Sequence, residues 1–350
     1  MRILGLDIGG ANLKASLIED EHIIKNYLKY YPIWTHDIKE LDIMLFDIRK
    51  TMEKTKKLDA IAITMTAELS DAFYTKREGV LLITDSIRRV FHDYINKLYF
   101  MNIFGQFVNI EEVLKNPLQI AAANWAATSR YIGTLFKNCI LIDIGSTTTD
   151  IIPIINHVPL TYGKNDTNRL LSGELVYTGV LRTEIPSITH NVPYRNQLCP
   201  IASEKFALIA DIHLILGHIK EEDYIIETAD GRDKNIKDSM ARIARIICAD
   251  IEMLSESEIM EIVKYIYQKQ LEQIENGIRK VIQNLKIDSL DDFKIIVTGL
   301  GAKFLAKPAA ENVGFTSIIN LDNYLGNKAG ITAPSAAIAL LLEQELKESI

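Results

Sequence analysis

Short apolar runs separated by turns of small residues are the most regular pattern along this chain. Near the start, Ile3–Leu6 and Leu13–Ile18 flank one such turn, and further along Ile140–Ile142 and Ile151–Ile155 flank another. Apolar runs bounded by glycine-containing turns are typical of β-strands. We therefore expect two β-hairpins, and their repetition indicates an internal duplication.

The rest of the pattern mixes helix-like and strand-like segments. Amphipathic spacing predicts helices at 41–57, 118–131, 206–219, 236–252, 258–285 and 333–346. Apolar runs predict further strands at 58–65, 80–83, 104–110 and 293–297. The mixture predicts an α/β protein with a first lobe at 1–135 and a second at 136–330. The closing segment at 331–350 could return to the first lobe.

Composition narrows the class of protein. At 350 residues, with 48% hydrophobic and 24% charged residues, the chain is typical of a soluble protein of two domains. Its net charge of −7 argues against general nucleic-acid binding. Three scattered cysteines indicate a reducing compartment. Met1 leads directly into a strand, and no apolar run is as long as a membrane span. A cytoplasmic protein without a signal peptide is therefore expected.

Both hairpin turns have the composition of a phosphate site. The first segment, Asp7–Lys14, reads DIGGANLK, and the second, Asp143–Asp150, reads DIGSTTTD. Small residues let backbone N–H groups approach an anion, and the hydroxyl groups of a Ser/Thr run need partners that phosphate oxygens supply. The aspartate that ends the first strand of each hairpin could hold a divalent cation there. A structural turn is the alternative for each, and Lys14 is either a phosphate ligand or a solvated strand lysine.

Further polar segments each carry two interpretations. Thr298–Ala302 is a glycine turn between a strand and a helix, which suits a nucleotide contact or a tight connection. Glu68 and Asp71 follow a strand, where a carboxylate acts as a base or metal ligand, or caps a helix. Glu174 and Arg182 lie in a polar stretch after the second hairpin. An arginine there could bind a substrate anion or form a surface ion pair.

The polar turn Asp230–Asp233 also contains an arginine, which could bind a substrate anion or form a surface ion pair. His213 and His218 are predicted on one helix, five residues apart, so that they do not share a face. The sequence contains no histidine metal motif, no nucleophile elbow and no P-loop.

The paired hairpins and the late glycine turn resemble the acetate/sugar kinase, Hsp70 and actin superfamily over essentially the whole chain. There they are called the phosphate-1, phosphate-2 and adenosine motifs. The second hairpin is similar to that of the hydantoinase/oxoprolinase branch. Closer still, four segments resemble the archaeal methanofuran-biosynthesis synthases: 7–14 (DIGGANLK), 66–71 (TAELSD), 124–128 (NWAAT) and 178–183 (TGVLRT).

The resemblance implies two RNase-H-like lobes with the active site in the interlobe cleft. It also implies a transferase that joins a furanmethyl diphosphate to the phenol of γ-glutamyltyramine and releases diphosphate. Mg²⁺ is the expected cofactor, and ATP is not required because the substrate carries its own leaving group. The short glycine turn at 298–302 departs from kinase-like relatives and favours this reading. The expected partners are these small molecules, with no nucleic acid and no membrane.

Site residues follow from the same resemblance. Asp7 and Asp143 are expected to position Mg²⁺, and Asp150 or Glu68 to take the phenol proton. Lys14 is a further expected catalytic residue. Diphosphate contacts are expected from Gly9, Gly10, Asn12, Gly145, Ser146, Thr147 and Thr148, with Gly299 and Gly301 at the adenosine-type turn. Arg182, Glu174 and Asn124 are expected to face substrate. The alternatives are an ATP-dependent small-molecule kinase of the same fold and a nucleotide-gated protein of the actin or Hsp70 type.

Overall fold

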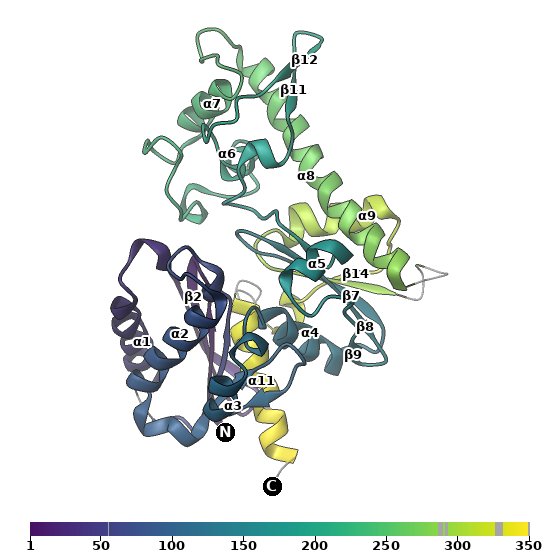
Figure 1. The fold of residues 1–350 in the computed structure, drawn as a ribbon. Coiled ribbons are helices and arrows are strands. Elements are labelled where there is room, and N and C mark those ends of the chain that lie inside the picture. Colours follow the sequence, from purple (N-terminus) through teal and green to yellow (C-terminus); the bar gives the residue numbers. More distant parts are fainter. Residues whose placement is uncertain (55, 286–289, 291–292, 326–331, 349–350) are drawn as a thin grey trace. The chain divides into compact units, whose positions relative to one another are not determined.

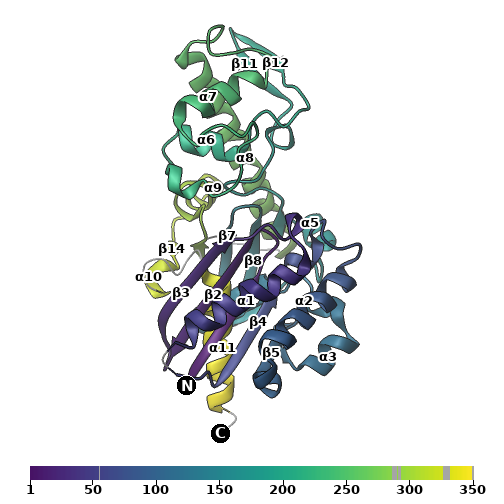
Figure 2. The same cartoon turned by 90° about the vertical axis from the view of Figure 1, so that its left-hand side faces the viewer.

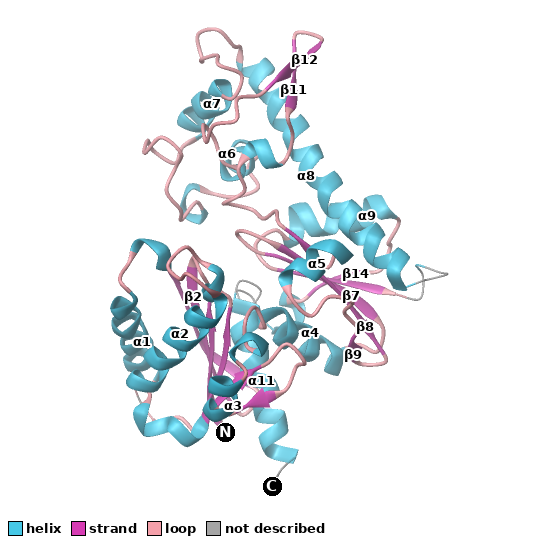
Figure 3. Ribbon diagram, in the orientation of Figure 1, coloured by secondary structure: helices cyan, strands magenta, loops and turns pink. Residues whose placement is uncertain are grey.

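Two compact units make up the chain in the computed structural model, which describes all residues except 55, 286–289, 291–292, 326–331 and 349–350. The first unit consists of Met1–Cys139, Ile152–Asn168 and Leu321–Ile350, and the second of Ile140–Ile151 and Arg169–Asn320. Helices and strands are mixed in both (Figure 1, Figure 3). The predicted α/β class is confirmed. None of the helices that the structure describes is long and apolar enough to cross a membrane.

A six-stranded mixed sheet forms the first unit, in the order β3-β2-β1-β4-β5-β6. Its strands are β1 (Arg2–Ile8), β2 (Asn12–Glu19), β3 (His22–Tyr30), β4 (Ala60–Met65), β5 (Leu98–Met101) and β6 (Phe107–Val108). The first hairpin is confirmed, because β1 pairs with β2 antiparallel. On its other side β1 pairs with β4 in parallel, so that the turn after β1 and the segment after β4 meet at one edge of the sheet.

Both faces of this sheet are covered, which explains why every residue of β1 is buried. The helices α1 (Ile38–Met52) and α2 (Lys76–Val90) lie on one face, and α11 (Ala333–Glu348) lies on the other (Figure 2). The first ten residues of α11 are buried all round. A hydrogen bond of 2.8 Å joins the hydroxyl groups of Ser16 and Ser335 across this contact.

A second mixed sheet has the order β10-β8-β7-β13-β14, with β9 paired to β8. Its strands are β7 (Cys139–Ile144), β8 (Thr149–Ile155), β9 (Val158–Pro159), β10 (Leu175–Val176), β13 (Lys294–Thr298) and β14 (Ile318–Asn320). The neighbouring strands β7 and β8 are the second predicted hairpin, and the boundary between the two units runs through β8. The long helix α8 (Glu256–Leu285) and α9 (Lys307–Val313) pack together in this unit.

The N-terminal half of α8 carries a helical subdomain with its own apolar core (Figure 1). It contains α6 (Ile209–Ile215), α7 (Ile236–Arg245) and the hairpin of β11 (Asn191–Tyr194) and β12 (Gln197–Pro200). The remaining helices of the chain are α3 (Ile110–Lys115), α4 (Asn124–Leu135), α5 (Asp166–Ser172) and α10 (Asp322–Leu325).

The predicted strand at 80–83 is wrong, because these residues lie inside α2. Thr75 caps this helix by accepting a hydrogen bond from the N–H of Glu78, and the Glu78 side chain accepts one from the N–H of Tyr74. The buried positions Val80 and Ile83 continue at Ile87 and Val90. The apolar residues of the first turns of this helix, taken alone, therefore have the sequence pattern of a short strand.

Four other predicted elements are shorter in the structure or are interrupted. At 104–110 only Phe107–Val108 form a strand, and Asn109 caps α3 by accepting from the N–H of Glu112. The helix predicted at 118–131 is interrupted at Ala122, whose φ of 53° is left-handed, and α4 begins at Asn124. The helices predicted at 206–219 and 236–252 are shorter, and end at Ile215 and Arg245.

Candidate functional site

The first turn joins β1 to β2 and is closed by a hydrogen bond of 3.0 Å from the N–H of Gly9 to the carbonyl of Asn12. Asp7 is the second-last residue of β1 and lies opposite Lys14 of β2 in the hairpin. Their charged groups lie 3.3 Å apart, and Asp7 is buried. Sequence-predicted residues Asp7, Gly9, Asn12 and Lys14 therefore share one turn, with a cation and a carboxylate side by side.

The segment that follows β4 lies against this turn. The N–H of Thr66 donates to the carbonyl of Ile8 at 2.9 Å, and a Cβ added to Gly10 would lie 3.9 Å from both Ala67 and Ser70. Thr64 is the neighbour of Asp7 in the parallel β1–β4 pair. The hydroxyl oxygens of Thr64 and Ser70 are buried and make no hydrogen bond with any described residue. Since buried hydroxyl groups without partners are costly, this edge is suited to a polar ligand.

Glu68 lies in the same segment, in a short 3₁₀ turn at Ala67–Leu69. Its side chain is buried, and neither carboxylate oxygen has a well-formed hydrogen bond to a described residue. Burial raises the pKa of Glu68 to about 7, and the backbone N–H groups of Glu68 and Ala122 offset burial only in part. The nearest charges are those of Lys76 and Asp166, which pair with each other at 2.7 Å. A carboxyl group with this pKa can accept or release a proton near neutral pH.

The second turn has the same construction as the first. It joins β7 to β8 and is closed by a hydrogen bond of 2.9 Å from the N–H of Gly145 to the carbonyl of Thr148. Asp143 precedes Gly145 by two positions, as Asp7 precedes Gly9. The carbonyl of Ser146 accepts hydrogen bonds from the N–H groups of Leu181 and Arg182, at 2.9 and 3.0 Å. These hydrogen bonds attach the second turn to the 178–183 segment.

Gly179 is required for this close approach. A Cβ on Gly179 would lie 2.5 Å from the backbone nitrogen of Thr147, which no real side chain tolerates. The Thr149 hydroxyl donates to the carbonyl of Thr178 at 2.8 Å, so that Thr149 fastens the segment and is not available to a ligand. The 178–183 segment therefore supports the second turn.

The adenosine-type turn also contacts the second hairpin. Gly299 has a φ of +84°, and a Cβ at this position would lie 2.5 Å from a carboxylate oxygen of Asp143. The N–H of Gly301 donates to the carbonyl of Ile144 at 3.0 Å, which repeats the contact of Thr66 with Ile8. The Thr298 hydroxyl oxygen is buried without a hydrogen-bond partner among the described residues. The helix that follows opens as a π-helix, Ala302–Ala306, before α9.

The structure gives Asp150 an anchoring position. Its carboxylate accepts a hydrogen bond of 2.6 Å from Arg169, whose side chain is almost fully buried. Arg169 also donates to the backbone carbonyl of Glu174, and that carbonyl accepts a second hydrogen bond from the N–H of Ile151. Asp150 therefore has a buried ion-pair partner, and its expected role as a base stays a prediction. Arg169 was missed in the sequence, where it carries no motif.

Two residues that were expected to face substrate, Asn124 and Arg182, make local contacts within the protein. Asn124 is the first residue of α4, and its side-chain oxygen accepts a hydrogen bond of 2.8 Å from the N–H of Trp125. Arg182 is half-buried and contacts the second turn through its backbone. Their expected contacts with substrate stay predictions.

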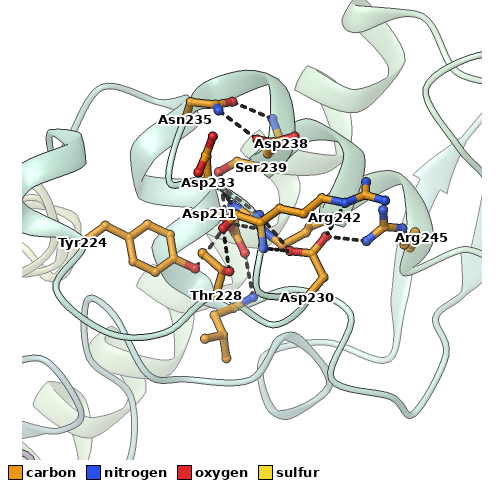
Figure 4. Close-up of polar contacts among 12 residues, drawn as sticks. Asp211, Tyr224, Thr228, Asp230, Asp233, Asn235, Asp238, Ser239, Arg242 and Arg245 are labelled. Carbon is orange, nitrogen blue, oxygen red and sulfur yellow. Dashed lines mark hydrogen bonds and ion pairs between the residues drawn. The ribbon is translucent and has the colours of Figure 1, made fainter.

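The polar turn at 230–233 contributes Asp230 to a partly buried ion-pair network in the helical subdomain (Figure 4). Asp230 pairs with Arg242 at 3.1 Å and with Arg245 at 2.7 Å. Arg242 also pairs with Asp211 at 2.8 Å, and neither side chain is exposed. Each charge of the network has an opposite partner, which indicates a structural role in holding α6 against α7.

The prediction that His213 and His218 lie on one helix is wrong, and the two side chains meet. α6 ends at Ile215, and Gly217, with a φ of +70°, lets the chain fold back. The N–H of His218 donates to the carbonyl of His213, and their Nδ1 atoms lie 3.1 Å apart. His213 also contacts Gln270 at 3.0 Å. Gln270 was missed because its helix reads as an ordinary amphipathic pattern.

Comparisons with known proteins give three findings. The family model of hydantoinase/oxoprolinase matches residues 59–345. A protein of Methanocaldococcus jannaschii described as (4-{4-[2-(gamma-L-glutamylamino)ethyl]phenoxymethyl}furan-2-yl)methanamine synthase is 37% identical over 98% of either chain. A Methanococcus vannielii protein of the same description is 32% identical over 61% of this chain and 95% of that protein. A nucleotide-free acetone carboxylase structure has a TM-score of 0.53 at 11% identity, covering 97% of this chain and 70% of that chain, which concerns the fold alone.

Proposed function

Because the chain belongs to the hydantoinase/oxoprolinase family and, within it, to the archaeal methanofuran-biosynthesis synthases, we propose that it forms an aryl ether by transferring a furanmethyl group from diphosphate to a phenol. The name of the Methanocaldococcus jannaschii relative describes a product in which a phenol oxygen is bonded to the methylene carbon of a furan. Making that bond requires a leaving group on the methylene carbon, and diphosphate is a leaving group that a phosphate-type turn can bind.

The cluster of buried oxygen atoms beside the first turn carries this proposal. The hydroxyl oxygens of Thr64 and Ser70 have no hydrogen-bond partner among the described residues, and the buried carboxylate of Glu68 has no well-formed one, because only the backbone N–H groups of Glu68 and Ala122 offset its burial. Such groups lower the stability of the protein unless a ligand or water bonds to them. Lys14 beside Asp7 adds a cation that would attract an anionic ligand to the same edge.

The proposed reaction breaks one bond and makes one. Diphosphate leaves with the electron pair of its carbon–oxygen bond, while the furan ring stabilises the positive charge on the methylene carbon. The phenol oxygen then donates a lone pair to that carbon, and Glu68 takes the phenol proton. The N–H group of Gly10 in the first turn, or that of Ser146 in the second, would neutralise charge that develops on diphosphate, which is the main way such a site lowers the barrier.

Asp7 and Asp143 are the carboxylates that we propose for Mg²⁺. The described residues include no group of three or more His, Cys, Asp and Glu side chains able to hold a metal. Mg²⁺ is commonly held by one or two carboxylates together with substrate phosphate oxygens, and each of these aspartates could supply one such carboxylate. When bound, the ion would offset negative charge on the diphosphate.

A direct assay tests the proposal. The purified protein is given the aminomethylfuran diphosphate, γ-glutamyltyramine and Mg²⁺, with and without ATP, and products are followed by mass spectrometry. We expect the ether and free diphosphate in equal amounts, without ATP. Product formation that requires ATP and releases equal amounts of ADP would contradict this proposal and favour a kinase-like reaction.

A further inference from the structure

Gln270 is an unusual residue in the middle of α8. Among the buried residues of this helix, all of which the structure describes, it alone is polar. Its side-chain nitrogen donates hydrogen bonds to the Thr178 hydroxyl at 3.0 Å and to the Gly179 carbonyl at 2.8 Å. Its side-chain oxygen lies 3.0 Å from Nε2 of His213. If these buried hydrogen bonds broke, the Gln270 amide and the Gly179 carbonyl would be left without partners, which costs free energy. The Gln270 amide therefore holds the backbone at Gly179 in place.

That piece of backbone determines where the second turn lies. Gly179 is in van der Waals contact with the turn at Thr147, and the next residue, Val180, donates its N–H to the carbonyl of Gly145 at 3.0 Å. A displacement of Gly179 would therefore displace the turn, because no space separates the two segments. Gln270 acts on the turn through this contact, without reaching it itself.

The direction of the hydrogen bonds follows from elementary chemistry. The Gly179 carbonyl can only accept, so the amide nitrogen of Gln270 faces it and the amide oxygen faces His213. His213 must then carry its proton on Nε2, which leaves Nδ1 to accept from the Nδ1–H of His218 at 3.1 Å. Burial lowers the pKa of His213 to about 3 and lowers that of His218 as well, which keeps both rings neutral as this arrangement requires.

The histidine pair also reaches the other segment that contacts the second turn. The His218 ring stacks on Phe304, with ring centroids 4.8 Å apart and an angle of 19° between the planes. Phe304 lies in the π-helix directly after Gly301, and its carbonyl accepts a hydrogen bond of 2.7 Å from the Tyr267 hydroxyl. One side-chain cluster thus contacts both the 178–183 segment and the start of the helix after the glycine turn.

We propose that Gln270 is a positioning residue for the phosphate-binding turn at 145–148, and that His213 and His218 hold its amide in the required orientation. This inference rests on the proposed function and deepens it, since it names what sets the shape of one diphosphate-binding turn. It also connects the turn to the helical subdomain, because His213 belongs to α6.

Two substitutions and a matched control test this role. Gln270→Glu keeps the size and the bond with His213 but places an oxygen against the Gly179 carbonyl, while Gln270→Leu removes all three bonds. Gln273→Leu is the control, since Gln273 lies on the same helix and donates to the backbone carbonyl of Ser187 instead. We expect the Kd of inorganic diphosphate with Mg²⁺ and the KM of the diphosphate substrate to rise about tenfold or more in the Gln270 variants, as the loss of a buried hydrogen bond allows. The KM of the phenol substrate should not change, and the control should behave as wild type.

Amide hydrogen exchange separates this inference from the proposed function because it needs no ligand. Exchange at 145–149 should become faster in Gln270→Glu, while the first turn at 9–12 serves as an internal reference and should not change. Unchanged exchange at 145–149, or unchanged diphosphate affinity, in a folded variant would overturn the positioning role. A wild-type protein that does not bind diphosphate would overturn the proposed function instead, and the exchange result would still decide the role of Gln270.

If neither variant folds, nitrogen NMR of the wild-type protein with labelled histidine decides. We expect the proton of His213 on Nε2. A proton on Nδ1 would show that Gln270 does not face the Gly179 carbonyl through its nitrogen, and the inference would be lost.

Discussion

Glu68 shows how a single buried carboxyl group couples stability to pH. Its pKa is about 7 in the folded protein and 4.5 ordinarily, so the folded state binds the proton more tightly. The stabilisation that this provides is complete below pH 4.5 and is lost as pH rises through about 7. Above that pH the ionised group costs on the order of 3 kcal/mol, because each pKa unit corresponds to about 1.4 kcal/mol.

The Glu68→Gln variant should therefore gain more stability over wild type at pH 8 than at pH 5. Glutamine has the same shape and carries no charge, so only the ionisation cost disappears. Urea unfolding at the two pH values measures the difference. We also expect ether formation to fall by about a hundredfold or more, as for the loss of a general base. An equal stability difference at both pH values would show that Glu68 does not titrate in this range.

Asp143 and Asp150 are close in sequence, but substitution by asparagine should lower the activity at Asp143 and the stability at Asp150. Asp143 is half-buried at the second turn, so Asp143→Asn should lower activity by about a hundredfold while stability changes little. Asp150 pairs with buried Arg169, so Asp150→Asn should lower the free energy of unfolding by about 3–5 kcal/mol. Activity assays and urea unfolding on both variants check the contrast. A stable and fully active Asp143→Asn protein would make that residue structural.

At the scale of the elements, glycine substitutions in the two hairpin turns test whether diphosphate binds there. A Cβ on Gly10 or on Gly145 would meet no atom closer than 3.8 Å, and neither glycine has a left-handed φ. Gly10→Ala and Gly145→Ala should thus fold normally, with stability unchanged or slightly raised. If diphosphate binds against these backbones, the added methyl group should weaken its affinity about tenfold or more, as a lost phosphate contact does. Calorimetric titration with diphosphate measures this, and full affinity in both variants would exclude the turns as its site.

How far the sequence predicts these elements depends on the range of the interactions that form them. The hairpins were predicted correctly because their signals, apolar runs and small turn residues, are local. The strand at 80–83 was wrong because the helix of Thr75–Val90 is recognised only from its cap and its later buried positions. The contacts of Gln270 and Arg169 were not predicted at all. Their partners are distant in sequence or made by backbone groups, and only the packed fold brings them together.

For the whole molecule, a ligand that binds only the folded state should raise its stability. We expect inorganic diphosphate and Mg²⁺ together to raise the melting temperature, by an amount equivalent to about 2.7 kcal/mol at a hundred times Kd. Either one alone should have a smaller effect, because the acidic turns and the anion repel each other without the cation. Excess EDTA should abolish both the shift and ether formation. Full activity in EDTA would contradict the role of a divalent ion.

The position of α11 has a consequence for synthesis on the ribosome. This helix covers one face of the first sheet and bonds to β2 through Ser335, although it lies at residues 333–348. Both segments of the second unit leave the ribosome before it. The unit that begins the chain is therefore completed after the unit that interrupts it. Until then the face of β1 that α11 covers stays exposed on the nascent chain, and we expect the chain to be prone to aggregation at this stage of its synthesis.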